Sequence, residues 1–284
     1  MLFDLQSPRR RRVIRVTFGA LAAIFAISFV FLGVGTGSGG FSFSDLFGGG
    51  SSGSSASSAF DDDIKAAQEN LAANPNDTTA MASLVRLHYQ SGNADRNSDG
   101  TLTDDGEQQL REGADAWNKY VKTINGDPDL TAALFALNTF DQLGQVDFQA
   151  ARSTTSNSEA LTSVQAAVGD WKSAGDAQQA LINAQPNKNN TNSYARLASY
   201  LYLAGDTQGA QQAVAKAKGS AKGSQASTID TQLKPIQQIG QQLQAAITQL
   251  TKQQQKTQGG AGGGNPLGGI SGGGGLGGVG TGGL

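Results

Sequence analysis

Glycine, which loses more conformational freedom on folding than any other residue, is concentrated in two stretches of this chain. Residues 33–53 contain nine glycines and residues 259–284 contain sixteen, which together make 25 of the 39. Residues 60–257 contain only thirteen, so a packed domain is expected there. The Gly/Ser-rich residues 36–59 are predicted to be a linker and residues 258–284 a disordered Gly-rich tail, because neither has enough apolar side chains to form a core.

The chain begins with a basic segment followed by an uncharged apolar run. Five arginines lie within residues 1–15, and residues 16–35 contain no charged side chain. About twenty apolar helical residues cross the ~30 Å hydrocarbon core of a membrane. Basic flanks stay in the cytoplasm, so residues 1–15 are predicted to be cytoplasmic, 16–35 a single-pass transmembrane helix and the rest extracytoplasmic. One alternative is a cleaved signal peptide; another, a nucleic-acid-binding arm, is disfavoured by the adjoining apolar run, so no nucleic-acid partner is expected.

Cysteine and histidine, on which many catalytic and metal centres depend, are nearly missing from the sequence. The chain has no cysteine and one histidine, which excludes disulfide scaffolds, thiolate zinc sites, iron–sulfur clusters and multi-histidine metal centres. It also has no Gly-x-Ser-x-Gly elbow, phosphate loop or dinucleotide-binding fingerprint. His88, Trp117 and Trp171 lie at positions of helical periodicity where packing is the expected role. A non-catalytic protein without a cofactor is therefore expected.

The central residues have the periodicity of helices and little of the alternation of strands. Three of the six prolines, Pro75, Pro128 and Pro186, each follow one amphipathic run and precede the next. Proline is common just beyond the end of a helix. The pattern predicts an all-α domain of stacked helix pairs, an α-solenoid, over residues 60–225.

One segment of this domain, residues 192–219, has the spacing of a helix-pair repeat. Large and small apolar residues surround a glycine at the turn, in the order Tyr194, Leu197, Ala198, Leu201, Gly205, Ala210, Val214 and Ala217. This order resembles the tetratricopeptide repeat (TPR). Partial matches are Met81, Leu84, Val85, His88 and Gly92; Ala116, Tyr120, Thr123 and Pro128; Ala133, Ala136, Leu137, Phe140 and Gly144; and Gly169, Trp171, Ala174, Gln178, Leu181 and Pro186.

The resemblance implies an irregular TPR-like solenoid. The family places about five residues between the turn glycine and the first small residue of the second helix. Here Gly92 and Ala116 are 24 residues apart, and Gly144 and Ala174 are thirty apart. Inserted loops or extra helices are therefore expected in the middle of the domain.

Residues 226–257 are predicted to form one amphipathic helix. Apolar residues recur at intervals of three and four, which places them on one stripe: Ile229, Leu233, Ile236, Ile239, Leu243, Ile247 and Leu250. The favoured interpretation is a capping helix over the open face of the last repeat. The alternative is one strand of a dimeric coiled coil.

In the TPR family, the partner usually lies along the inner face made by the first helix of each pair. Carried over by register, the resemblance implies that an unidentified protein partner contacts Thr79, Arg86, Tyr89, Thr131, Asn138, Asp141, Asn192, Ser199 and Tyr202. This set differs from the Lys/Asn clamp with which some family members bind a C-terminal carboxylate.

A candidate calcium loop begins at Asp95. Its ligand positions follow the spacing of the loop, with Gly100 at the sharp turn, and are Asp95, Asn97, Asp99, Thr101 and Thr103. The twelfth position is Gly106 where a bidentate glutamate is usual, so any calcium affinity is expected to be weak. The favoured alternative is a polar loop with Asx-turns, which uses the same residue types.

These features lead to one expected function and one alternative. The expected protein is a membrane-anchored TPR scaffold that mediates protein–protein interaction in the bacterial cell envelope. Its layout is similar to that of anchored repeat proteins beside the Sec translocon, which implies a role in export or envelope assembly. The alternative is a structural, self-associating envelope protein with a weak calcium loop.

Overall fold

The computed structural model describes residues 59–185, 191–222, 225–257 and 267. All of them belong to one compact unit, Ser54–Leu284. These residues form eight helices and no strand, with one isolated antiparallel bridge between Arg96 and Leu102. The all-α prediction is confirmed for this part. The predicted basic segment (1–15), transmembrane helix (16–35), linker (36–59, except Ala59) and tail (258–284, except Leu267) lie outside it. Among the described helices, none has the length and apolar character needed to cross a membrane.

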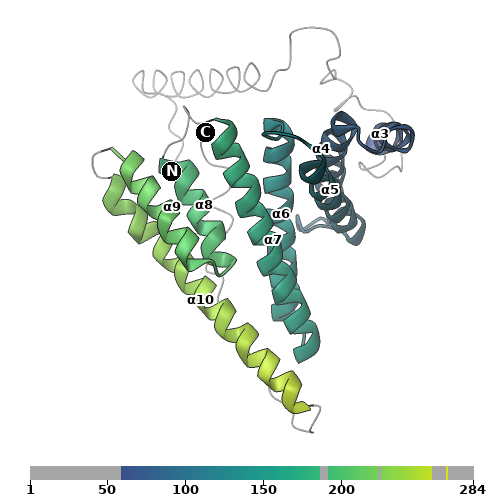
Figure 1. Ribbon diagram of the computed structural model, residues 1–284. Coiled ribbons are helices and arrows are strands. Elements are labelled where there is room, and N and C mark those ends of the chain that lie inside the picture. Colours follow the sequence, from purple (N-terminus) through teal and green to yellow (C-terminus); the bar gives the residue numbers. More distant parts are fainter. Residues whose placement is uncertain (1–58, 186–190, 223–224, 258–266, 268–284) are drawn as a thin grey trace, which may run out of the picture. The chain divides into compact units, whose positions relative to one another are not determined.

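The helices follow one another with short connections (Figure 1). In chain order they are α3 (Asp61–Ala73), α4 (Thr78–Ala94), α5 (Asp104–Thr123), α6 (Leu130–Ser153), α7 (Asn157–Ala184), α8 (Thr191–Leu203), α9 (Thr207–Ser220) and α10 (Gln225–Thr257). Pro75 and Pro128 lie in the α3–α4 and α5–α6 connections as predicted, and Pro186 lies outside the described residues.

Five of these helices begin at a residue whose side-chain oxygen accepts a hydrogen bond from a backbone N–H of the first turn. The capping residues are Asp77, Thr103, Asp129, Ser156 and Asp206. Their local chemistry sets where each helix starts, before any packing is considered.

The helices stack as successive pairs, α4 with α5, α6 with α7 and α8 with α9. Helix α6 also packs against both helices of the pair before it, and α8 packs against α7. Helix α3 packs against α4 at one end of the order, and α10 packs against α7, α8 and α9 at the other. A continuous core results, because each new pair covers the apolar face left by the previous one.

The interval from Gly144 to Ala174, which is longer than in the TPR family, is filled by two long helices. Helix α6 continues for nine residues beyond Gly144, and α7 begins seventeen residues before Ala174. An inserted loop occurs in one place only among the described connections, between α4 and α5. That loop fits the expectation of inserted loops or extra helices between Gly92 and Ala116. Between Gly144 and Ala174 there is neither, because the apolar stripes of α6 and α7 continue through this region and bury Phe148, Ala160 and Val164.

Two of the three glycines matched to the TPR turn position lie inside helices. Gly205 follows α8 and has a φ of +82°, as expected for a helix end. Gly92 lies in α4, where an added Cβ would meet the carbonyl oxygen of Gly106 at 2.7 Å. Gly144 lies in α6, where an added Cβ would meet Trp171 Nε1 at 2.6 Å. Both therefore permit close approach of neighbouring helices.

Helix α10 has its apolar stripe covered within the chain. Ile229, Leu233, Ile236, Leu243 and Leu250 are all buried. Leu267, the one described residue of the predicted disordered tail, is also fully buried in the core cluster, which differs from the expectation at that position.

Gly240→Ala is expected to destabilise the protein by about 1–3 kcal/mol, because the added Cβ would meet the backbone carbonyl of Tyr202 where α10 crosses α8. Gly169→Ala in α7 is the matched control. Nothing lies within 4 Å of its added Cβ, so it should stabilise the helix by about 0.5–1 kcal/mol. Urea denaturation followed by circular dichroism measures both; equal stability of the two variants would contradict this packing of α10.

Candidate functional site

The predicted partner residues lie on the first helices of the pairs, but with very different exposure. Thr79, Thr131 and Asn192 are exposed, and Arg86, Tyr89, Asn138 and Asp141 are half-buried. Ser199 and Tyr202 were also predicted to contact the partner, but they are only 3% and 8% exposed. Both are buried in the domain, so that prediction is wrong for these two residues. Helix α8 presents both residues to the interior of the domain instead of to its surface.

Helices α4 and α6 meet at a polar and aromatic cluster around Tyr89. The Tyr89 ring lies 5.2 Å from that of Phe135, and Gln142 Nε2 donates a 3.5 Å hydrogen bond to the Tyr89 hydroxyl. Arg96 Nη2 donates to Gln142 Oε1 at 2.9 Å, which ties the α4–α5 loop to α6. Burial is the main cause of the raised pKa of Tyr89. Sequence analysis identified Tyr89 but not its partners, because their contacts join residues about fifty positions apart.

Helices α6 and α8 meet at Asp141. Gln145 Nε2 donates to Asp141 Oδ2 at 3.0 Å, and Tyr200 also hydrogen-bonds to this carboxyl group. Burial raises the pKa of Asp141 to about 6, against the opposing effects of Arg196 and these hydrogen bonds. Tyr200 was missed because its position in α8 has the periodicity of a core residue.

A second polar cluster joins α5, α6 and α7. Arg111 Nη2 donates to Asp147 Oδ1 at 2.7 Å and to Glu107 Oε1 at 2.7 Å. The pKa of Asp170 is raised to about 8. Burial is the largest cause, and a hydrogen bond with Asp147 and the negative charge of Asp147 add to it. Asp147 Oδ2 and Asp170 Oδ2 are both buried without a partner that donates a hydrogen bond among the described atoms. With this pKa the Asp170 carboxyl group holds a proton at neutral pH, which it shares with Asp147 through the hydrogen bond between them.

This carboxyl pair had a signal in the sequence. Asp147 lies in the apolar stripe of α6, between Leu143 and Ala151, where a charged residue must find a partner. The identity of that partner could not be read from the spacing, since Arg111 and Asp170 belong to other helices.

The candidate calcium loop is closed by its own hydrogen bonds. Asp99 Oδ1 accepts from the backbone N–H of Thr101 at 3.0 Å and from its hydroxyl at 2.6 Å, which lowers the pKa of Asp99. Asn97 Nδ2 donates to Thr101 Oγ1 at 3.0 Å, and Arg96 Nη1 donates to the Gly100 carbonyl at 2.7 Å.

The other two predicted ligands of this loop are also engaged with the fold. Thr103 caps α5, and its backbone N–H donates to the Asp95 carbonyl at 3.3 Å. In the described part of the chain, no group of three or more His, Cys, Asp or Glu side chains is placed to hold a metal ion. These contacts are those of an Asx-turn loop, and calcium binding stays a prediction.

Calcium binding by this loop can be measured directly. If it binds calcium weakly, millimolar calcium should shift the backbone amide signals of residues 95–103, and Asp99→Asn should reduce the shift several-fold. Asp115→Asn, on the exposed side of α5, is the control and should leave the shift unchanged. Identical spectra with calcium and with chelator would contradict the calcium prediction.

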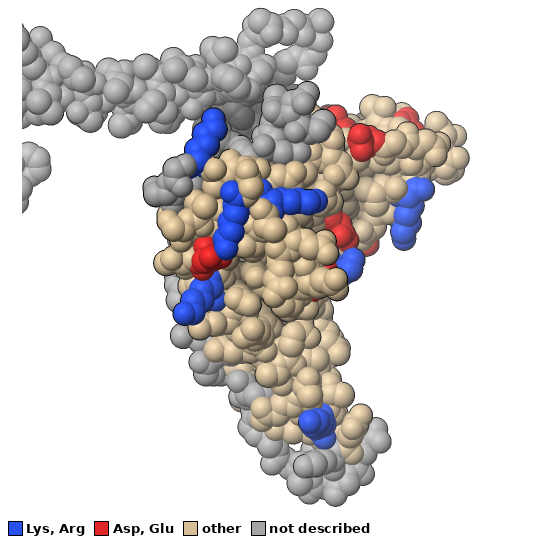
Figure 2. All heavy atoms as spheres, turned by 60° about the vertical axis from the view of Figure 1, so that its left-hand side comes forward, with Lys and Arg blue, Asp and Glu red and all other residues tan. Residues whose placement is uncertain are grey.

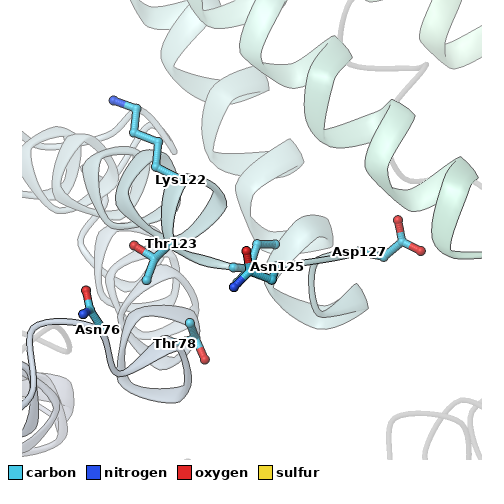
Figure 3. A pocket seen from close by; sticks show the side chains of 7 residues that line it. Asn76, Thr78, Lys122, Thr123, Asn125 and Asp127 are labelled. Atoms are coloured by element: carbon cyan, nitrogen blue, oxygen red, sulfur yellow. The ribbon is translucent and has the colours of Figure 1, made fainter.

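A polar cleft of about 710 Å³ lies between the two proline-containing connections (Figure 3). Its lining is mainly amide and hydroxyl groups: Asn76, Thr78, Lys122, Thr123, Ile124, Asn125 and Asp127. Figure 3 shows the Lys122 amine pointing away from Asn76 and Thr78. None of the predicted partner or calcium residues lines this cleft.

The single histidine and both tryptophans have packing environments, as expected. His88 is buried, with Nδ1 2.7 Å from Gln109 Oε1. Trp117 packs beside Tyr120 and Trp171 beside Phe148, with ring centroids 5.7 Å and 5.8 Å apart.

Comparisons of the chain with protein-family models, with curated protein sequences and with solved structures found no match. The residues and their geometry are therefore the evidence that bears on function.

Proposed function

We propose that the chain is a non-catalytic, single-pass membrane protein that presents an irregular TPR-like solenoid outside the cytoplasm and binds a protein partner there. Its setting is the bacterial cell envelope, in export or envelope assembly. The observation that carries the proposal is the position of Tyr89, Asn138 and Asp141 on the first helices of successive pairs, where all three are half-buried. We call the surface defined by these three residues the inner face.

The packing of the helices supports a binding surface built from several repeats. Helix α6 contacts α4 directly, and Asp141 of α6 hydrogen-bonds to Tyr200 of α8. First helices that touch one another in series form one surface, on which a partner can contact several repeats.

An exposed apolar side chain adds a hydrophobic element to this surface. Leu134 is 41% exposed and precedes Asn138 by one helical turn.

The proposed topology rests on the sequence, and it can be tested because the chain has no cysteine of its own. In intact cells, a membrane-impermeant maleimide should label Gln165→Cys, which lies on the exposed side of α7. Ser7→Cys should be labelled only after the membrane is opened. Labelling of Ser7→Cys in intact cells, or protection of Gln165→Cys, would contradict the orientation.

Partner binding by the inner face is tested by position-specific crosslinking in living cells. A photoreactive residue at Leu134 or Asn138 of the full chain should give the same discrete protein adduct, and one at Gln165 should not. Absence of adducts, or equal adducts at all three positions, would argue against an interaction through the inner face.

A further inference from the structure

Charge is distributed very unevenly along the stack of helices. Residues 61–123, which contain α3, α4 and α5, have twelve acidic and six basic side chains, a net charge of −6. Residues 207–257, which contain α9 and α10, have six lysines and one acidic residue, a net charge of +5. The two ends of the helix order therefore differ by eleven charges within one chain.

Four lysines of the basic end reach the surface. Lys216, Lys222 and Lys234 are exposed, and Lys218 is 38% exposed while it pairs with Asp230 at 2.6 Å. We call these four residues the lysine face. In Figure 2, blue side chains collect on the left around a small red area, over the helices that lie on the left of Figure 1.

The acidic end belongs to a helix with an open side. Helix α3 packs against α4, and Ile64 and Ala67 are its buried residues. Its first turn exposes Asp61, Asp62 and Asp63. An end helix with so few buried residues leaves most of its surface available to another molecule.

We infer that the lysine face of one copy binds the acidic end of a second copy, so that chains associate head to tail. The contact joins two different surfaces, so it is heterologous and can continue into open chains of copies. This inference is independent of partner binding at the inner face, which involves α4 and α6.

A second copy is a better candidate for the lysine face than an acidic lipid surface, because of where the acidic residues lie in the chain. The complementary charge is carried by the same chain, on helices that pack at the other end of the stack and cannot reach the lysine face from within. Every copy therefore supplies both halves of the contact in equal amounts.

The experiment is sedimentation velocity of the full chain in a non-ionic detergent at low and high salt. Association should appear at 20 mM NaCl and disappear at 500 mM, because screening shortens the reach of surface charges. Lys216→Glu/Lys222→Glu/Lys234→Glu should weaken it by about tenfold or more. The control, Lys65→Glu/Lys119→Glu/Lys122→Glu, changes the net charge equally but leaves the lysine face intact and should still associate.

A charge-swap mixture gives the decisive result. Asp61→Lys/Asp62→Lys/Asp63→Lys should fail to associate with itself, and mixing it with the lysine-face variant should restore association, since the first keeps a wild-type lysine face and the second keeps a wild-type acidic end. A wild-type chain that stays monomeric at 20 mM NaCl overturns the inference. So does lysine-dependent binding to vesicles containing phosphatidylglycerol without self-association, which would assign the lysine face to lipid.

Discussion

Trp171→Ala is expected to destabilise the protein by about 3–5 kcal/mol, the range for removing a fully buried large aromatic side chain. Trp171 has no exposed surface and is the largest of the fully buried side chains in the described residues. It lies against Gly144 of α6 and packs beside Phe148. Its loss opens a cavity between α6 and α7, and the rigid backbones of these helices limit how far the neighbouring side chains can fill it.

Trp171→Phe is the matched control, because it keeps an aromatic ring in the same place. It should lose about 1 kcal/mol, since the smaller ring leaves a modest cavity while a buried indole N–H without a described partner is removed. Urea denaturation followed by circular dichroism measures both variants. A loss below 1.5 kcal/mol for Trp171→Ala would show that the α6–α7 interface is looser than described.

Arg111→Met is expected to cost about 2–3 kcal/mol, because it leaves the buried Asp147 carboxylate without its cation. This value lies at or below the range for a fully buried ion pair. The reason is that the Arg111 side chain is 44% exposed, so water already screens part of the interaction. Lys172→Met, at an exposed pair with Asp176 in α7, is the control and should change stability by less than about 0.5 kcal/mol.

The carboxyl pair also predicts a dependence of stability on pH. The pKa of Asp170 is raised to about 8 in the folded protein, against about 4 for an aspartate in an unfolded chain. Between these values the folded state holds a proton that the unfolded state has released, so stability falls as pH rises. The contribution is complete below about pH 4 and is lost as pH rises through about 8. Asp141, whose pKa is about 6, adds to the fall in stability between about pH 4 and pH 6.

Asp170→Asn tests this linkage, because an amide donates to Asp147 at every pH. The variant should flatten the fall in stability between about pH 5 and pH 8, and at pH 8.5 it should be at least as stable as the wild type. Asp176→Asn, exposed in α7, should keep the wild-type slope. Parallel pH profiles for wild type and Asp170→Asn would contradict a shared proton between Asp147 and Asp170.

The fold class and most helix positions could be predicted because their causes are local. Apolar periodicity marked the long helix near the C-terminus as 226–257, against Gln225–Thr257 in the structure. Capping aspartates and the prolines at 75 and 128 mark helix boundaries through the chemistry of a few neighbouring residues. The same periodicity placed His88, Trp117 and Trp171 in the core.

The candidate sites were predicted less well, because they depend on contacts between distant residues. Tyr89 and Asp141 were identified by register, but Ser199 and Tyr202 were assigned to the surface and are buried, since the rotation of α8 is set by packing against α7 and α10. The pairing of Arg111, Asp147 and Asp170 joins three helices and has no sequence spacing of its own.

Composition and periodicity alone determined that this chain has a glycine-poor helical domain between two glycine-rich stretches. Those properties depend on which residues are present and how they repeat, which any reader of the sequence can count. Tertiary structure alone decided that Gly92 and Gly144 are close-packing positions, that the extra residues in the middle lengthen α6 and α7, and that two aspartates share one environment. These outcomes depend on which surfaces meet, and the meeting of surfaces is decided by the packing of the whole domain.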